Sequence, residues 1–204
     1  IHTMEHKNIV ATIYLKDGMA VKDPAHTDEK QDVLELARLY NDSGIDKIIC
    51  YDLSDEDEEH EKNILAIREI NRNIEIKTCG GGNIKRLEDV KKYLYAGCVE
   101  VILNGSKPSA VEILNEASAR FGTEKILVSL TTVDFLFKTK DILEDHVHEL
   151  VIYNRALLDS IEGITNVPYI VDVDSYDIED IATLLKSDKI RGICGAFIND
   201  TQTD

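Results

Sequence analysis

Residues 74–94 read IEIKTCGGGNIKRLEDVKKYL, and this stretch guides the interpretation of the whole chain. Its first residues are typical of a short strand, and Leu87, Val90 and Leu94 recur at helical spacing after the glycines. A strand, a glycine turn and a helix, in that order, can surround an anion with backbone N–H groups and a positive helix end. Glycine also permits positive φ and close approach of the backbone. The stretch predicts either a phosphate site or a tight turn without a ligand.

The strand-then-helix order recurs along the chain. Apolar strand-like runs are expected at residues 8–15, 47–53, 74–78, 99–104, 126–131, 149–153, 169–173 and 191–198. Helices are expected at residues 28–40, after a capping Ser54, and at 87–95, 110–121, 133–145 and 178–185. Strands that are apolar on both faces and alternate with helices are typical of covered parallel sheets. About eight such units, with no dinucleotide fingerprint after the first strand, predict an α/β fold and a closed (β/α)8 TIM barrel.

The 204 residues are few for a barrel, for which about 250 is typical. We therefore expect short loops and an eighth helix that is missing or incomplete. Residues 1–3 precede Met4 and are interpreted as an expression scar, which leaves residues 4–204 as a single TIM-barrel domain.

The formal net charge of −16 argues against nucleic acid as a partner, because phosphate backbones need lysine- and arginine-rich surfaces. No apolar run approaches the ~20 residues of a membrane helix and no signal peptide is visible, so a cytoplasmic protein is expected. The four cysteines lack CxxC spacing and are expected to be buried, reduced thiols. His146 and His148 are expected outside the barrel mouth, and neither a metal nor a cofactor is predicted.

In a barrel, function lies at the carboxyl ends of the strands. Two neighbouring ends form a candidate anion cradle, whose residues are Gly81, Gly82, Asn83, Asn104, Gly105 and Ser106. Asp52 ends an apolar strand and is expected either inside the mouth or as a cap of the following helix or loop. Asp17, at the end of the first strand, is a second candidate carboxylate. Arg155 either reaches a phosphate or offsets Asp172 and Asp174.

Several segments resemble one family. They are residues 13–22 (IYLKDGMAVK), 51–53 (YDL), 80–84 (GGGNI), 96–106 (AGCVEVILNGS) and 119–128 (ARFGTEKILV). The sequence of these segments is similar to that of the half-barrel repeat family of histidine biosynthesis. That family contains phosphoribosylformimino-aminoimidazole carboxamide ribotide isomerase and the cyclase subunit of imidazole glycerol phosphate synthase. The resemblance is strong over residues 8–132 and weaker to residue 198.

The resemblance implies a phosphorylated ribonucleotide as ligand, or a phosphate or sulfate ion in its place. One phosphate would lie at Gly82, Asn104 and Gly105, and the other at Gly195 and Ala196. The two catalytic aspartates of the family fall on Tyr14 and Thr131, whose side chains have pKa values too high for proton relay near neutral pH. The paired glycines of the second phosphate site fall on Val173 and Asp174, beside Asp172.

Two functions remain open. The first is a phosphate-binding domain that is noncatalytic by itself within a histidine-pathway fusion enzyme. The second is an active isomerase or cyclase that uses Asp17, Asp52, Asp172 or Asp174. The pattern looks most like the degenerate N-terminal barrel of a multifunctional protein that also carries a phosphoribosyl-AMP cyclohydrolase module. A homodimer through an apolar surface near Ile193 and Phe197 also remains open.

Overall fold

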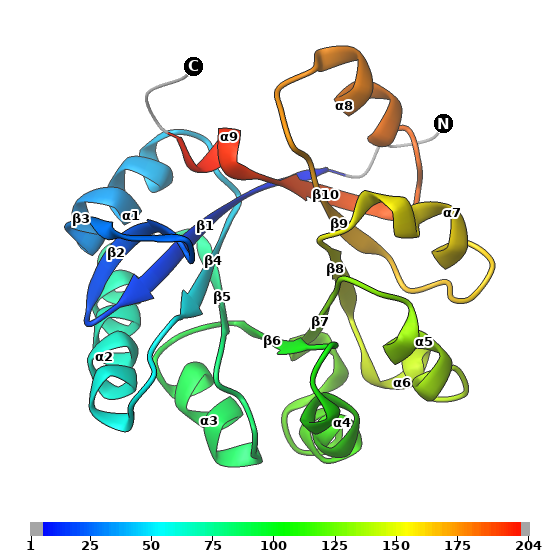
Figure 1. The fold of residues 1–204 in the computed structure, drawn as a ribbon, viewed down its shortest axis with the longest axis horizontal. Coiled ribbons are helices and arrows are strands. Elements are labelled where there is room, and N and C mark those ends of the chain that lie inside the picture. The colour runs from blue at the N-terminus through cyan, green and yellow to red at the C-terminus, as the bar shows by residue number, and fades with distance from the viewer. Residues whose placement is uncertain (1–5, 201–204) are drawn as a thin grey trace.

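The structure is a computed structural model and describes residues 6–200; the expected expression scar lies outside that range. Within these residues, eight parallel strands pair in a closed ring. Figure 1 shows the ring with the helices around it. In ring order the strands are β1 (Asn8–Lys16), β4 (Lys47–Asp52), β5 (Lys77–Gly81), β6 (Glu100–Asn104), β7 (Ile126–Leu130), β8 (Glu149–Ile152), β9 (Tyr169–Asp172) and β10 (Ile190–Cys194). Parallel pairing of β10 with β1 closes the ring, which confirms the predicted (β/α)8 TIM barrel.

The interior of the barrel is packed with side chains. Each strand of the ring contributes one buried residue to the inner cluster, which consists of Val10, Ile49, Cys79, Ile102, Leu127, Val151, Ile170 and Cys194. Tyr51 and Tyr153 pack against this cluster. The residues that alternate with them along each strand face the helices in a second, larger core. Both faces of the sheet are therefore apolar, which is why the strands appear as continuous hydrophobic runs in the sequence.

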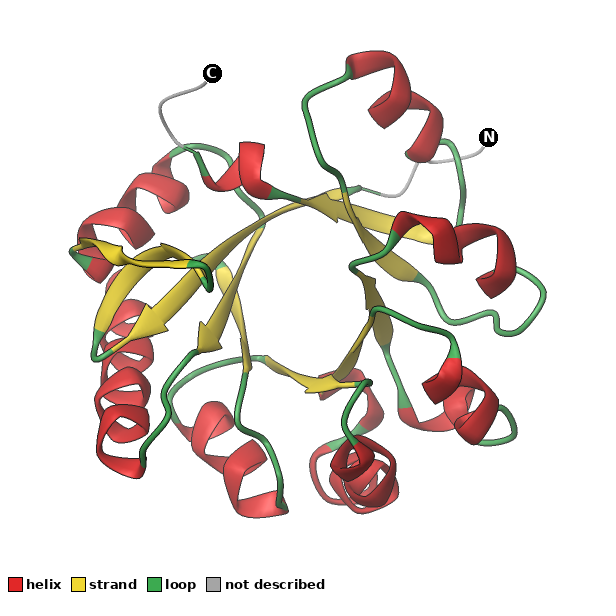
Figure 2. Cartoon of the chain, in the orientation of Figure 1, coloured by secondary structure: helices red, strands yellow, loops and turns green. Residues whose placement is uncertain are grey.

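Helices surround the ring on its outer side (Figure 2). The α-helices are α1 (Val33–Asp42), α2 (Asp57–Asn73), α3 (Leu87–Tyr95), α4 (Pro108–Phe121), α5 (Asp134–Thr139), α6 (Leu143–His146), α7 (Leu158–Ile161), α8 (Ile178–Leu184) and α9 (Ala196–Asn199), with 3-10 turns η1 (Thr123–Lys125) and η2 (Arg155–Leu157). The first four are long and regular. The later ones are short, and α9 follows the last strand as a single turn.

The helix predicted at residues 28–40 is partly wrong. The structure has an antiparallel hairpin of β2 (Met19–Asp23) and β3 (His26–Gln31), with β2 beside β1, before α1 begins at Val33. Residues 26–31 are polar and mostly exposed, so they offer no apolar face to a helix. Asp32 caps α1 instead, and its side chain accepts a hydrogen bond from the Glu35 amide.

Three other predictions need correction. Helix α2 begins at Asp57 rather than directly after Ser54, because the Ser54 side chain bonds to Asp52 instead of capping the helix. The helix expected at residues 133–145 is divided into α5 and α6. Ile193 is buried in the outer core and is not a surface residue, whereas Phe197 is partly buried and lies against Tyr176.

The four cysteines are buried and free, as predicted. Within residues 6–200, no helix is both long and apolar enough to cross a bilayer.

Candidate functional site

The sequence predicted a strand at 74–78 followed by a three-glycine turn, but Gly80 and Gly81 are the last residues of β5 and only Gly82 follows the strand. Contacts with the protein itself shape this glycine segment. Gly82 has φ of +98°, and a Cβ at that position would lie 2.4 Å from the Asp52 carbonyl oxygen. The hydroxyl of Tyr93 lies within hydrogen-bond distance of the carbonyl oxygens of Gly81 and Gly82, at 2.8 and 2.6 Å. A Cβ on Gly80 would collide with the Tyr93 ring. Close packing alone therefore accounts for glycine at these positions, with or without a ligand.

Asp52 is the centre of a buried network behind this turn. Its carboxylate accepts from the amide and hydroxyl of Ser54, from Asn63 Nδ2 at 2.5 Å and from Asn83 Nδ2 at 2.8 Å. His60 Nδ1 lies 2.6 Å from Asp52 Oδ2. Burial raises the pKa of Asp52, but these donors outweigh it and lower the pKa to about 2. The hydrogen bond with Asp52 raises the pKa of His60, although burial of the His60 ring lowers it.

The predicted position of Asp52 inside the mouth is therefore wrong. Side chains alternate along β4, so Tyr51 faces the barrel interior while Asp52 faces α2, in register with the outward-facing Leu15. The second expectation for Asp52, a structural role in the following loop, matches its contacts. Asp17 lies at the turn between β1 and β2 and pairs with Lys62 on α2 at 3.1 Å. Neither carboxylate lines the cavity at the mouth.

The second half of the predicted cradle follows β6, which pairs directly with β5. Asn104 and Ser106 are exposed there. The Gly105 amide donates to the Ser129 carbonyl at 2.8 Å, and the Ser106 amide donates to Asn104 Oδ1 at 3.0 Å. The Asn83 side chain turns toward Asp52 and Ser54. The structure thus brings the two predicted turns to neighbouring strand ends, with several of their polar groups already paired internally.

A pair of tyrosines spans the mouth of the barrel. The hydroxyl oxygens of Tyr51 and Tyr153 lie 2.6 Å apart. Tyr51 is on β4 and Tyr153 directly follows β8, and these strands occupy opposite positions in the ring of eight. Tyr14 stacks on Tyr51 with ring centroids 5.9 Å apart. The bridge therefore separates the strand ends of β5, β6 and β7 from those of β9, β10 and β1.

The tyrosine bridge was not predicted from the sequence. Its signal was present, because Tyr51 and Tyr153 each lie two residues after an inward-facing residue, Ile49 and Val151. Strand alternation places such residues on the same face. Burial raises the pKa of both hydroxyls well above the ordinary value, so both are neutral.

A cavity of about 830 Å³ lies on the β9–β10–β1 side of the bridge. Gly195 and Ala196, predicted as the second phosphate subsite, line it together with Asp172. Gly195 has φ of +153°, and a Cβ there would lie 2.3 Å from the Val173 carbonyl oxygen. Burial, and then the charge of Asp174, raise the pKa of Asp172 to about 6. A negatively charged group therefore stands where the resemblance places a phosphate.

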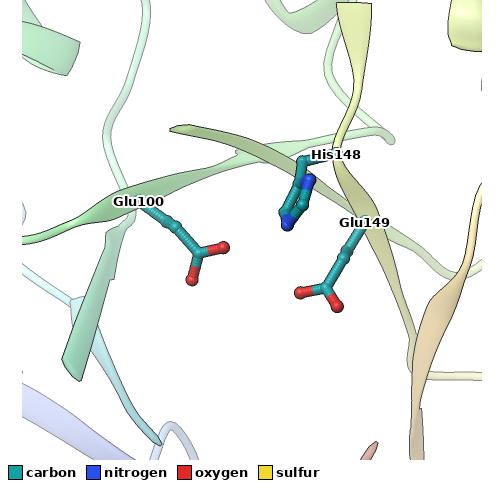
Figure 3. A group of neighbouring side chains, drawn as sticks. All are labelled: Glu100, His148 and Glu149. Atoms are coloured by element: carbon teal, nitrogen blue, oxygen red, sulfur yellow. The ribbon is translucent and has the colours of Figure 1, made fainter. Parts of the chain in front are cut away.

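A group of possible metal ligands lies at the opposite, N-terminal end of the barrel. Figure 3 shows Glu100, His148 and Glu149, whose ligand atoms lie within 4.8 Å of one another. The Lys47 ammonium already occupies this position, 2.6 Å from Glu100 and 3.4 Å from Glu149. Burial lowers the pKa of Lys47, but the carboxylates outweigh it and raise the pKa. We interpret Lys47, Glu100 and Glu149 as a buried ion-pair cluster, and the exposed His148 lies outside the mouth as predicted.

Arg155 does not pair with Asp172 or Asp174, the carboxylate partners predicted from the sequence, but with Asp180. Its guanidinium forms a bidentate pair with Asp180 on α8, at 2.5 and 2.6 Å. This geometry is the usual strong arrangement of arginine with carboxylate. Arg155 therefore contributes to the attachment of α8, and its guanidinium is held by Asp180.

Comparison with known proteins identifies the family. The sequence profile described as "Histidine biosynthesis protein" matches residues 8–157. Imidazole glycerol phosphate synthase subunit HisF of Campylobacter lari is 27% identical over 149 residues, 72% of this chain and 54% of the relative. The HisF subunit of Trichormus variabilis is 33% identical over 129 residues, 62% of this chain and 50% of the relative.

The HisF subunit of Halalkalibacterium halodurans is 32% identical over 126 residues, or 61% of this chain and 50% of the relative. The chain thus spans about half the length of these curated relatives. The profile match extends from β1 through β8 and includes both turns of the predicted cradle. The chain therefore belongs to the histidine biosynthesis protein family.

Proposed function

We propose that this barrel binds one phosphorylated ribonucleotide at the ends of β5 and β6 and does not by itself catalyse isomerisation or cyclisation. Membership of the histidine biosynthesis family supports the ligand class. The name of the relatives, imidazole glycerol phosphate synthase, indicates a phosphorylated compound for those proteins. The glycine turn and the exposed Asn104 and Ser106 lie on adjacent strand ends, where a phosphate could be held by neutral donors.

The proposal that the barrel is noncatalytic by itself rests on the side chains at the ends of β1 and β7. Tyr14 and Thr131 occupy the positions at which the resemblance implies a pair of carboxylates. Burial and the charge of Asp172 raise the pKa of Tyr14 to about 12, so it holds its proton throughout the physiological range. A threonine hydroxyl has no accessible ionisation there. The general acid and base that proton transfer requires are thus not supplied at these two positions.

Titration calorimetry with ribose 5-phosphate tests phosphate binding. The unmodified protein should show one site, and Ser106→Glu should abolish it because a carboxylate at that exposed position repels the phosphate. Ser160→Glu, on the outer surface in α7, adds the same charge and should leave binding unchanged. Absence of binding to the unmodified protein, or two equal sites, would contradict the proposal.

An active isomerase or cyclase is the alternative, and one observation favours it. Of the four aspartates Asp17, Asp52, Asp172 and Asp174, only Asp172 lines the mouth cavity. A carboxyl group with pKa near 6 is suited to proton transfer close to neutral pH. Turnover by the purified protein that is lost in Asp172→Asn would support this alternative. The fused cyclohydrolase module and the homodimer stay predictions.

A further inference from the structure

We propose that the cavity between the tyrosine bridge, β9, β10 and the β2–β3 hairpin binds a flat, positively charged nitrogen compound, such as an amidinium or a protonated heterocycle. This site is separate from the phosphate site proposed above. Its walls include Tyr14, Tyr153, Phe197, Asp172, Asp23 and Glu29. Aromatic rings and carboxylates together are the usual environment of organic cations.

Asp172 is the group that would meet the cation. It is partly buried at the end of β9, and its hydrogen bond comes from Cys194 Sγ, a weak donor, at 3.8 Å. Within residues 6–200, no lysine, arginine or histidine forms an ion pair with it. A partly buried carboxylate with so little compensation is unfavourable in the free protein. A positively charged ligand would supply the missing partner.

The other charges at the rim of the cavity are partly neutralised by one another. Lys22 lies 3.8 Å from Glu29, and Asp23 lies 2.8 Å from His26 Nδ1, both within the hairpin. The hairpin side chains Lys22, Glu29 and Lys30 are exposed, whereas Asp172 lies deeper, beside Tyr14. The deep end of the cavity is therefore negative, which disfavours phosphate and favours a cation.

The tyrosine bridge limits the size and direction of the ligand. Because the Tyr51 and Tyr153 hydroxyls meet at 2.6 Å, a ligand in this cavity cannot extend directly across the mouth to Asn104 without breaking that contact. The cavity of about 830 Å³ is nevertheless large enough for a ring compound. A compact ligand confined to one half of the mouth fits this geometry, and an elongated one does not.

Three isosteric probes test the proposal: benzamidine, which is cationic, benzamide, which is neutral, and benzoate, which is anionic. Each is titrated at pH 7.5 into ¹⁵N-labelled protein while the Gly195 and Ala196 amide signals are followed by NMR. Benzamidine should shift both signals saturably. Asp172→Asn should weaken it by about tenfold, the usual value of a hydrogen bond to a charged group, and should leave benzamide unchanged.

Asp159→Asn is the matched control, since it removes one negative charge from an exposed position on α7. It should leave benzamidine binding unchanged. Equal weakening in the two variants, benzoate binding as tight as benzamidine binding, or no saturable shift with benzamidine would overturn the proposal. Ribose 5-phosphate should not displace benzamidine, and displacement would also overturn it. Failure of the phosphate site alone would leave these benzamidine results unchanged.

Discussion

Replacement of Asp52 by asparagine should destabilise the fold strongly, although Asp52 does not line the cavity at the mouth. The side chain of Asp52 is fully buried and receives hydrogen bonds from Ser54, Asn63 and Asn83 as well as contacting His60. Asparagine has the same shape but puts an NH2 group where a carboxylate oxygen accepts. An NH2 group at the Oδ1 position would leave the Ser54 amide and Asn63 Nδ2 without their acceptor, and one at the Oδ2 position would do the same to Asn83 Nδ2.

The magnitude follows from the pKa. The pKa of Asp52 falls from 3.8 to about 2 in the folded protein, which corresponds to about 2 kcal/mol of stability from the charged form. Unpaired buried donors add about 1 kcal/mol or more each. We expect a total loss of about 3–5 kcal/mol at pH 7. Because the folded-state pKa is depressed, the charge-dependent part is present above pH 3.8 and disappears as the pH falls through 2.

Urea unfolding followed by circular dichroism at pH 7 measures this loss. Asp55→Asn is the control, because Asp55 is 84% exposed and its pairing with Lys16 should contribute little. Ser54→Ala, which removes a single donor, should cost about 1 kcal/mol. A decrease below 1 kcal/mol for Asp52→Asn, or one equal to that of Asp55→Asn, would refute the assignment of Asp52 as the centre of the network.

Three further changes have defined outcomes. Asp172→Asn should stabilise the protein by about 1–2 kcal/mol at pH 7.5 and not at pH 3.5, as urea unfolding at the two pH values can check. Because the pKa of Asp172 is raised to about 6 in the folded protein, its contribution to stability is fully present below pH 3.8 and is lost as the pH rises through 6. Solvent screening reduces the size of this effect. Tyr153→Phe should lower the free energy of unfolding by about 1–2 kcal/mol in the same assay, because it leaves the Tyr51 hydroxyl unpaired. The double variant that also carries Tyr51→Phe should be only slightly less stable than Tyr153→Phe. Additive losses from the two substitutions would argue against the bridge. Gly82→Ala should lower the thermal midpoint by several degrees, whereas Ser160→Ala should not, because the new Cβ would lie 2.4 Å from the Asp52 carbonyl oxygen.

The barrel could be predicted from the sequence because its signals are local and repeated. Strands such as β4 and β7 are apolar on both faces, and glycines at the helix ends mark the entry into the next strand. The hairpin of β2 and β3 could not be predicted, because its polar residues 26–31 carry no periodicity that distinguishes a strand from a helix. It forms where the end of β1, at residues 14–16, extends beyond the pairing of β1 with β10, which is a tertiary effect.

The candidate site was predicted only in part. The sequence placed Gly82, Asn104 and Gly195 at strand ends, and the structure places them there. It did not show that Asp52 points outward, since the direction of a side chain depends on the register of its strand. The contact between Tyr51 and Tyr153 depends on two strands about one hundred residues apart meeting across the ring. Strand alternation indicates that both side chains face inward, but their meeting is visible only once the barrel is closed.

We propose that the tyrosine bridge divides the mouth and that phosphate binds in one half only. A crystal structure of the protein soaked with a ribonucleotide that carries a phosphate at each end tests it most directly. We predict one phosphate beside Asn104 and Ser106, with the Tyr51–Tyr153 contact intact. A ligand that crosses the mouth, with its second phosphate on Gly195 and Ala196 and the two tyrosines apart, would contradict it.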